Sequence, residues 1–389
     1  MSRARVAGLA LWIAALLGLV RCGSSTAKLE PLAWQKVPGP DPALLGAVVG
    51  NGSPGAFDER ASFTVSAFKD GVTYNLYYGG SDAFATACAG INGTHWRIGL
   101  AQSSDGIAWT RVPSQIPGAP AGAVLDIGAP GDFDSYLAYR PFVLKDEVAG
   151  ATLYRMWYNG SNHPFNCPPG ELALARRIGY AESPDGVHWT KMNTGGPGAV
   201  VSNVLPLGAP GSIDEQQVGY VWVLKDGAQY KMYYSANDAN NFWRVALAVS
   251  TDARTWTKVP GKIANGSILD LGGAGAFDVA CAYQPTVVKE KESLYRMWYR
   301  GCQAAAPVVG GPSQGVIGYA ESNDGITWVK IRQNGPSGEA ISKGAAGEFD
   351  SGGLTTPSVL LDGNGWNMFY AGFDTTGQYR IGLARAPRQ

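Results

Sequence analysis

The chain has 389 residues, of which 31 are basic, 31 are acidic and 45% are hydrophobic. Three arginines and no acidic residues lie in residues 1–22, so the remainder carries 28 basic and 31 acidic side chains, a formal charge of about −3. No basic face emerges from this balance, which argues against nucleic acid as a partner.

Residues 1–22 are typical of an export signal. Two arginines precede an apolar run over residues 6–20, which is too short to span a bilayer comfortably. Cys22 followed by Gly-Ser-Ser resembles the start of a bacterial lipoprotein, although Arg21 departs from the small residue that normally precedes a lipidated cysteine. Cleavage after Ala27 is the alternative. We therefore expect an exported protein, which is either anchored to a bacterial membrane through lipid on Cys22 alone or free in the periplasm or outside the cell.

A segment of the form Trp-x-Lys-Val recurs five times, with variations, at intervals of 67 to 80 residues. Its tryptophans are Trp34, Trp109, Trp189, Trp256 and Trp328. Before each later copy stand three short runs rich in aromatic and β-branched residues and bounded by Gly, Asp or Pro, which indicate strands. A repeat of this length fits one sheet of four antiparallel strands.

The last repeat stops near Arg385 without a Trp segment, and the missing copy stands at residues 34–37. A strand from the N-terminus would complete the last sheet and remove two exposed edges. The sequence therefore predicts an all-β fold: a five-bladed β-propeller with four antiparallel strands per blade, whose ring is closed by an N-terminal strand. Residues 28–389 would form this single domain, which we expect to be a monomer.

Some residues recur in every repeat. An aspartate opens each one, and these residues are Asp58, Asp134, Asp214, Asp278 and Asp350. A turn needs the same group every time, whereas a ligand site needs different groups, so we expect these carboxylates to bond backbone N–H groups in turns. We expect the same of Asp105, Asp185, Asp252 and Asp324, and we expect the recurring tryptophans to pack between blades.

Residues that break the repeat are better candidates for function. Just before the Pro or Val of the first strand, where strands converge on one mouth of the channel, stand Thr64, Arg140, Tyr220, Gln284 and Thr356. Other variable residues near this mouth are Asp82, Asn162, Asp238, Asp374, Glu59 and Glu215, with the aromatic residues Phe63, Tyr139 and Tyr283 nearby. Polar groups beside aromatic faces suit a carbohydrate. The alternative for Asp82, Asp238 and Asp374 is a structural ion pair with Arg97, Arg244 and Arg380.

The cysteines and histidines predict disulfides and no metal or cofactor. Cys88, Cys167, Cys281 and Cys302 form an even set in an exported chain. Their places in the repeat favour the pairs Cys88–Cys167 and Cys281–Cys302. The three histidines show no metal-ligand spacing, and no glycine-rich phosphate loop or nucleophile elbow is present in the sequence.

The repeated pattern Phe-Asp, Pro-x-Val-x-Lys-Asp, Tyr-x-Met-Trp-Tyr and Ile-Gly-Tyr-Ala resembles the five-bladed propellers of the arabinanase, β-xylosidase, invertase and levansucrase group. It is also similar to the mannoside phosphorylases. The resemblance covers residues 30–387 and implies the fold more specifically than the activity. Hydrolases of this group use two Asp and one Glu, but the corresponding positions here are not acidic, so that triad does not carry over.

Two functions follow from this resemblance. The first is a glycoside hydrolase-like enzyme with a rearranged acid pair, drawn from Glu215, Asp82, Asp238, Asp374 and Glu59. The sugar would then bind through Arg140, Tyr220, Gln284, Asn162, Tyr139 and Tyr283. The second is a catalytically silent propeller that binds a glycan or a protein at the cell surface, and a purely structural surface protein is a more distant third.

Overall fold

The computed structural model describes residues 31–82, 95–162, 176–192, 204–263, 265–303, 314–363 and 365–388. The export signal and Cys22 lie outside these residues. The described part is built from β-strands, apart from a short 3₁₀ turn at Pro42–Leu44 that the sequence pattern did not indicate. No helix in this part is long and apolar enough to span a membrane.

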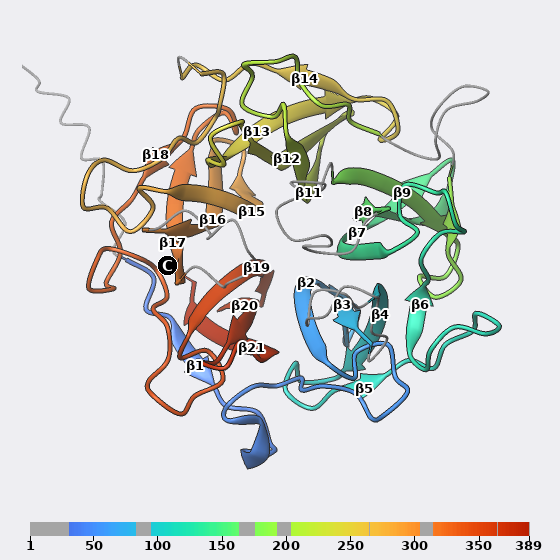
Figure 1. Cartoon of the computed structure of the whole chain (residues 1–389). Helices are drawn as coiled ribbons and strands as arrows, with labels where there is room; N and C mark the ends of the chain where they lie inside the picture. The colour runs from blue at the N-terminus through green and yellow to red at the C-terminus, as the bar shows by residue number, and fades with distance from the viewer. Residues whose placement is uncertain are drawn as a thin grey trace, which may run out of the picture. The chain divides into compact units, whose positions relative to one another are not determined.

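The strands follow the repeat seen in the sequence (Figure 1). Repeat 1 contains β2 (Ala61–Asp70), β3 (Thr73–Ser81), β4 (Trp96–Ser103) and β5 (Thr110–Arg111). Between repeats 1 and 2 lies β6 (Ala123–Leu125). Repeat 2 contains β7 (Leu137–Val148), β8 (Ala151–Ser161), β9 (Arg177–Ser183) and β10 (Thr190–Lys191). Repeat 3 contains β11 (Gln217–Asp226), β12 (Gln229–Asn237), β13 (Trp243–Ser250) and β14 (Thr257–Val259). Repeat 4 contains β15 (Cys281–Lys291), β16 (Leu294–Cys302), β17 (Gly315–Ser322) and β18 (Val329–Lys330). Repeat 5 contains β19 (Gly353–Asp362), β20 (Gly365–Phe373), β21 (Tyr379–Pro387) and, from the N-terminus, β1 (Gln35–Val37).

Strand β1 pairs antiparallel with β21, with Gln35 opposite Arg385 and Val37 opposite Leu383. The N-terminal strand therefore supplies the fourth strand of the sheet β1-β21-β20-β19. The other repeats are not separate sheets. One parallel pair, Trp96 with Leu137, joins repeats 1 and 2 into a sheet of nine strands. A second parallel pair, Trp243 with Cys281, joins repeats 3 and 4 into a sheet of eight.

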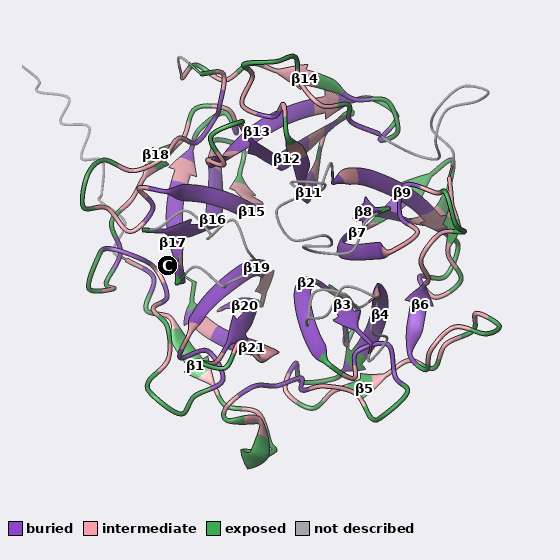
Figure 2. Cartoon of the chain, viewed as in Figure 1, coloured by how far each residue is buried: buried purple, intermediate pink, exposed green. Residues whose placement is uncertain are grey.

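In each repeat the outermost strand is the least buried. The first strands β2, β7, β11, β15 and β19 lie nearest the centre (Figure 1) and are buried over most of their length (Figure 2). The short outermost strands are exposed or half-buried. The first strands are therefore the ones that can line a central site.

The aspartate that opens each repeat is buried and ties three strands together. At most 4% of its surface is exposed. Its Oδ2 accepts a hydrogen bond of 2.8–3.0 Å from a tyrosine hydroxyl of the second strand. It also forms an ion pair of 2.5–2.8 Å with the Lys or Arg of the Trp-x-Lys segment. The five sets, here called aspartate clamps, are Asp58–Tyr78–Arg111, Asp134–Tyr158–Lys191, Asp214–Tyr234–Lys258, Asp278–Tyr299–Lys330 and Asp350–Tyr370–Lys36. The structural role expected from the sequence is present, but these Oδ2 contacts are with side chains rather than the expected backbone N–H groups.

The recurring tryptophans pack between repeats. Each ring stands edge-on to an aromatic ring in the second strand of the preceding repeat, with centroids 5.5–6.1 Å apart. The pairs are Trp109–Phe369, Trp189–Tyr77, Trp256–Trp157, Trp328–Tyr233 and Trp34–Trp298. These contacts run from each repeat to its neighbour and also from repeat 1 to repeat 5.

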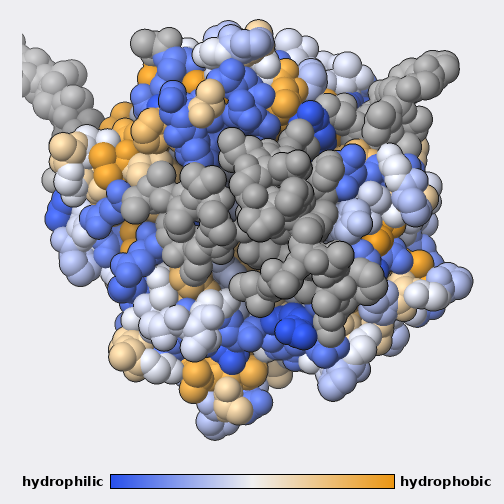
Figure 3. All heavy atoms as spheres, viewed as in Figure 1, coloured by the Kyte–Doolittle hydropathy of each residue, from blue (hydrophilic) through white to orange (hydrophobic). Residues whose placement is uncertain are grey.

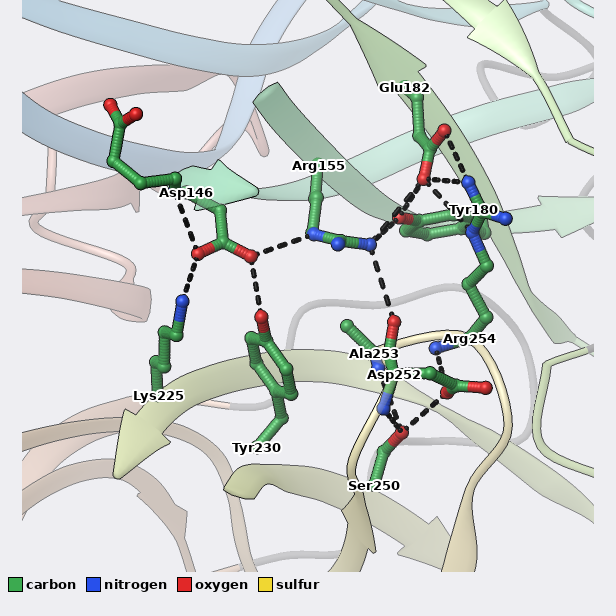
Figure 4. Close-up of polar contacts among 11 residues, drawn as sticks. Asp146, Arg155, Tyr180, Glu182, Lys225, Tyr230, Ser250, Asp252, Ala253 and Arg254 are labelled. Carbon is green, nitrogen blue, oxygen red and sulfur yellow. Dashed lines mark hydrogen bonds and ion pairs between the residues drawn. The ribbon is translucent and has the colours of Figure 1, made fainter. Parts of the chain in front are cut away.

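A second set of contacts between repeats is ionic. An acidic residue near the end of one first strand pairs with a basic residue of the adjacent repeat. The pairs are Asp70–Lys145, Asp146–Lys225, Asp226–Lys289, Glu290–Arg388 and Asp362–Lys69. Figure 4 shows the most connected of these carboxylates, Asp146, which accepts hydrogen bonds from Lys225, Tyr230 and Arg155.

The turn aspartates and one disulfide agree with the sequence analysis. Asp105, Asp185, Asp252 and Asp324 each accept backbone N–H groups two and three residues further on. Cys281 and Cys302 form a disulfide between directly opposed residues of β15 and β16. The other expected pair, Cys88 with Cys167, lies outside the described residues.

The clamp in repeat 5 predicts that β1 contributes to stability. Lys36→Met removes the cation beside Asp350, which is fully buried and would keep only the Tyr370 hydrogen bond. We expect a loss of about 1–3 kcal/mol in the free energy of unfolding, because the lysine is partly exposed and the carboxylate is not. Chemical denaturation measures this loss. Lys343→Met, at an exposed lysine, is the control, and equal midpoints for the two variants would contradict the prediction.

The ionic contacts predict sensitivity to acid. Burial raises the pKa of Asp146, but hydrogen bonds from Lys225, Tyr230 and Arg155 outweigh this effect and hold the pKa below its usual value. A lowered folded pKa stabilises the fold above the ordinary pKa of about 3.9 and the contribution is lost as the pH falls. We therefore expect Tm to fall below about pH 4. Lys225→Met should lower Tm at pH 7 and reduce the further drop in acid, and a drop of unchanged size would show that this pair does not contribute.

Candidate functional site

A bulge interrupts the first strand of every repeat. The fourth residue of each of these strands has a φ of 45–56°, in the left-handed region, although none is glycine. These residues are Thr64, Arg140, Tyr220, Gln284 and Thr356, the same five positions that vary in the sequence. A left-handed conformation costs about 1–3 kcal/mol per residue and persists only where the surroundings impose it. Because strained backbone positions are common at functional sites, these five positions are candidates for a binding site.

A small cavity lies between the bulges. All five bulge residues line it, together with the residues that follow them, including Phe142 and Trp222. Its volume is about 30 Å³, and one water needs roughly 10–15 Å³. The cavity therefore has room for a small group such as a hydroxyl or a carboxylate, and not for a whole sugar ring. Its lining comes from the fourth to the sixth residues of the first strands.

Aromatic rings support the cavity from two sides. On one side Tyr220, Tyr283 and Trp243 have ring centroids 5.1–6.1 Å apart and pack with the Cys281–Cys302 disulfide. The cluster on the other side contains Phe63, Trp96, Tyr139 and Tyr379. Tyr139 is fully buried and Tyr283 nearly so, which makes both supports for the cavity wall rather than lining residues.

Two bulge residues have hydrogen bonds to neighbouring repeats. The side-chain oxygen of Gln284 accepts from the Thr355 hydroxyl at 2.5 Å and from the Thr356 backbone N–H at 2.8 Å. The Tyr220 backbone N–H donates to Asn159 Oδ1 at 2.9 Å. These contacts fix the bulges in register. Among the described residues, the buried Gln284 amide nitrogen and Thr356 hydroxyl have no hydrogen-bond partner, so both have unused hydrogen-bonding capacity at the cavity wall.

Arg140 is held between two tyrosine rings. Its guanidinium lies 3.5 Å from the centroid of Tyr220 and 4.4 Å from that of Tyr139. Burial, followed by repulsion from Arg176, lowers the pKa of Arg140 to about 10 despite the favourable tyrosines. The arginine therefore stays charged at neutral pH.

Three candidate acids form ion pairs. Asp82 pairs with Arg97, Asp238 with Arg244 at 2.7 Å, and Asp374 with Arg380 at 3.4 Å. These are the structural pairs that the sequence left as an alternative. None of the three acids lines the cavity between the bulges.

Glu59 and Glu215 cap equivalent turns. Glu59 Oε2 accepts the Gly55 backbone N–H and Glu215 Oε2 accepts the Gly211 backbone N–H. In repeats 2 and 5 a different N–H of the turn is bonded, two positions earlier: the Ala129 N–H donates to Asp132 Oδ2 and the Ala345 N–H donates to Glu348 Oε2. Glu59 and Glu215 thus have the same turn contact, which a structural role is enough to explain. Glu215 differs from Glu59 in one respect, because its Oε1 also accepts the Ala239 N–H, next to Asp238.

The remaining candidates lie elsewhere. Asn162 is exposed and lines a separate pocket with His95 and Tyr136. Within the described ranges, no group of three or more His, Cys, Asp or Glu side chains is arranged to hold a metal ion.

The sequence analysis overlooked Arg300, which is buried and donates to the Tyr283 hydroxyl at 2.6 Å. The other repeats carry Gly79, Asn159, Ser235 and Ala371 at this position of the second strand. Gly315 makes room for the arginine, since a Cβ there would lie 2.4 Å from Arg300 Nε. This pair of departures from the repeat was the signal that could have identified Arg300.

Comparison with known proteins supports the fold. No family model matches the chain. It is 29% identical over 210 residues to the uncharacterized protein Rv1502 of Mycobacterium tuberculosis, a match that covers 54% of this chain and 58% of that protein. The chain thus spans less than two thirds of the length of the curated relatives it matches.

Solved structures match most of the chain. One named as a glycoside hydrolase has a TM-score of 0.64 and 16% identity, covering 91% of this chain and 94% of the other. A structure from the GH130 family of mannoside phosphorylases, described as containing glycoside hydrolases that target β-1,2 mannosidic linkages in Candida mannan, has a TM-score of 0.61 and 16% identity, covering 93% and 98%. The β-1,2-mannobiose phosphorylase of Listeria innocua, in complex with β-1,2-mannobiose, has a TM-score of 0.57 and 11% identity, covering 84% and 90%.

At these identities the likeness shows the fold: the chain has a glycosidase-like propeller fold. The mannoside phosphorylase part of the expected resemblance recurs among these structures. The resemblance to the arabinanase, β-xylosidase, invertase and levansucrase group stays a prediction.

The Gln284 contacts predict that the site is coupled across repeats. Gln284→Leu leaves the buried Thr356 N–H and Thr355 hydroxyl without their shared acceptor, which should cost about 1–3 kcal/mol of stability. Gln314→Leu, at an exposed glutamine outside the cavity, is the control. Equal unfolding midpoints for both variants would mean that the bulges do not depend on this link.

Proposed function

We propose that the chain is an exported, carbohydrate-acting five-bladed β-propeller that binds a glycan at the cavity between its bulges. The observation that carries this proposal is the set of five bulge residues. They share one strained backbone position but differ in chemistry: two threonines, an arginine, a tyrosine and a glutamine. A purely structural requirement would favour one side chain throughout, whereas a ligand needs different groups in different places.

Each repeat would be one blade of four strands, and β1 would complete the last blade. The edge-on tryptophan contacts and the ion pairs support a closed ring, because both sets link every repeat to the next and also link repeat 5 to repeat 1. The cavity is then the inner end of a central channel, which is where propellers commonly bind ligands.

The lining chemistry suits a sugar. Arg140 and the Gln284 amide donate hydrogen bonds, the Thr356 hydroxyl both donates and accepts, and the Tyr220 ring offers an aromatic surface. The described part of the face in Figure 3 is mostly hydrophilic, with small hydrophobic patches. The mannobiose complex of a structural neighbour supports a glycan as the ligand.

The proposal that the protein is exported rests on the sequence of residues 1–22 alone. The mature protein would be attached to a bacterial membrane through lipid on Cys22, or released after cleavage behind Ala27, and would act as a monomer. Mass spectrometry of the mature N-terminus distinguishes the two routes.

Binding at the cavity predicts that Tyr220→Ala weakens affinity for the glycan. The variant removes an aromatic lining residue, so we expect Kd to rise at least tenfold, about 1.4 kcal/mol. A glycan array identifies the ligand, and calorimetry compares the variants. Val72→Ala, at an exposed residue, is the control. A Kd unchanged by Tyr220→Ala, with the fold intact, would move the site away from the cavity.

A second candidate function is hydrolysis with a non-standard acid pair. The contact of Glu215 with the Ala239 N–H brings its carboxyl to the same turn as Asp238, and glycoside hydrolysis needs two carboxyls across the scissile bond. The opposing observation is that Glu215 caps a turn and Asp238 pairs with Arg244, which favours glycan binding without cleavage.

Glu215→Gln tests the hydrolytic role. The purified protein is first screened against polysaccharides and nitrophenyl glycosides. If Glu215 is the acid or base, the variant should lower kcat by roughly 100-fold or more. Glu59→Gln removes the matching turn cap in repeat 1 and reports the effect of the cap alone. A kcat within threefold of the parent would exclude Glu215 and direct the search to Asp82, Asp238 and Asp374.

A further inference from the structure

Arg140 is a buried cation that forms no ion pair with any of the described residues. Only 6% of its surface is exposed, and its Nε and Nη1 have no hydrogen-bond partner within the part of the chain that the structure describes. Its contacts there are the faces of Tyr139 and Tyr220. Cation–π contacts offset part of the free-energy cost of burying a charge, but they do not neutralise the charge.

Two other buried arginines form ion pairs with acidic side chains. Arg155 bonds the buried Asp146, and Arg296 bonds the buried Glu290. Both pairs obey the rule that a charge is buried together with its counter-charge. Arg140 differs from these two, because no carboxylate among the described residues forms an ion pair with it.

The surroundings of Arg140 add positive charge. Arg176 lies close enough to disfavour its protonated form, and Arg300 donates to Tyr283 on the neighbouring wall. The fold does not require a cation at the bulge, because the equivalent positions hold Thr64, Tyr220, Gln284 and Thr356. The repeat itself therefore does not account for an arginine at this position.

We propose that Arg140 receives the carboxylate of an acidic sugar, so that the glycan bound at the cavity carries a uronic acid or a similar carboxylated residue. The planar guanidinium matches a carboxylate in shape and charge. The cavity, at about 30 Å³, admits such a group while the sugar ring stays outside it. This inference rests on the proposed function, and it names the substrate class.

The first experiment uses the unmodified protein. Calorimetry compares oligogalacturonate and oligoglucuronate with their methyl esters, which keep the sugar and remove the charge. We expect at least one acid to bind tenfold or more tightly than its ester. Inorganic phosphate is tested in parallel, as an anion without a sugar.

The second experiment uses variants of Arg140. Arg140→Met should abolish the preference for the acid over the ester, and Arg140→Lys should retain only part of it. Arg332→Met, at an exposed arginine, should change neither affinity. Arg140→Met should leave Tm unchanged or raise it, because it removes an uncompensated buried charge. The comparison of acid with ester on the parent protein does not depend on any variant folding.

The outcomes separate this inference from the proposed function. Binding of neutral glycans or esters as tight as that of the acids overturns the acidic-sugar assignment but leaves a glycan site. Binding of phosphate without any acidic sugar also overturns it. Failure to bind any glycan overturns both proposals. A preference for the acid that survives Arg140→Met overturns the assignment to Arg140, because another group then binds the carboxylate.

Discussion

The fold depends on a carboxylate buried in every repeat. Taking an ionised aspartate out of water costs several kcal/mol, and the cost is recovered only when good partners surround it. In each aspartate clamp the partners come from the second strand and from the outermost strand, so the carboxylate fixes the positions of strands that are far apart in the sheet. In repeat 5 the cation is Lys36 of β1. The clamp therefore makes the N-terminal strand part of the last repeat more firmly than its three paired residues alone would do.

The contacts that hold the repeats together leave the side chains of the bulge residues free to vary. The clamps and the edge-on tryptophans hold the repeats at their outer parts, and the inter-repeat ion pairs hold the first strands near their ends. The fourth residue of each first strand carries none of these contacts through its side chain, apart from Gln284, which links to repeat 5. Its left-handed backbone is imposed by the surroundings, so threonine, arginine, tyrosine and glutamine are all accommodated at the same place. The strained backbone at these five positions is consistent with a binding site, where the side chains suit a ligand rather than the fold.

The sequence predicted the strands, the pairing of β1, the Cys281–Cys302 disulfide and the variable bulge positions, because each follows from a periodic pattern or from spacing. It did not predict the partners of the repeated aspartates, since Tyr78 and Arg111 approach Asp58 only after the strands have assembled. Nor did it predict that Glu215 shares its turn-capping role with residues at other positions, such as Asp132 and Glu348. An alignment of the repeats compares residues at the same position, so it does not show that acids at different positions of a turn can each accept a backbone N–H of that turn. Arg300 was missed for a similar reason, because its significance depends on Gly315 in the adjacent strand.

Charge also bears on where cleavage could take place. The resemblance to the arabinanase and invertase group leads to the expectation of an acid at a bulge position, but no bulge residue here is acidic and one is a buried arginine. A general acid in that cavity would lie beside the charge of Arg140, which would lower its pKa and keep it ionised, the wrong state for donating a proton. A carboxylate near Glu215 or Asp238 lies outside the cavity and escapes this effect. If the protein cleaves a glycosidic bond, the arginine would therefore hold the carboxylate of one sugar at the cavity, while the reacting bond lies further out, toward the turn that carries these two acids.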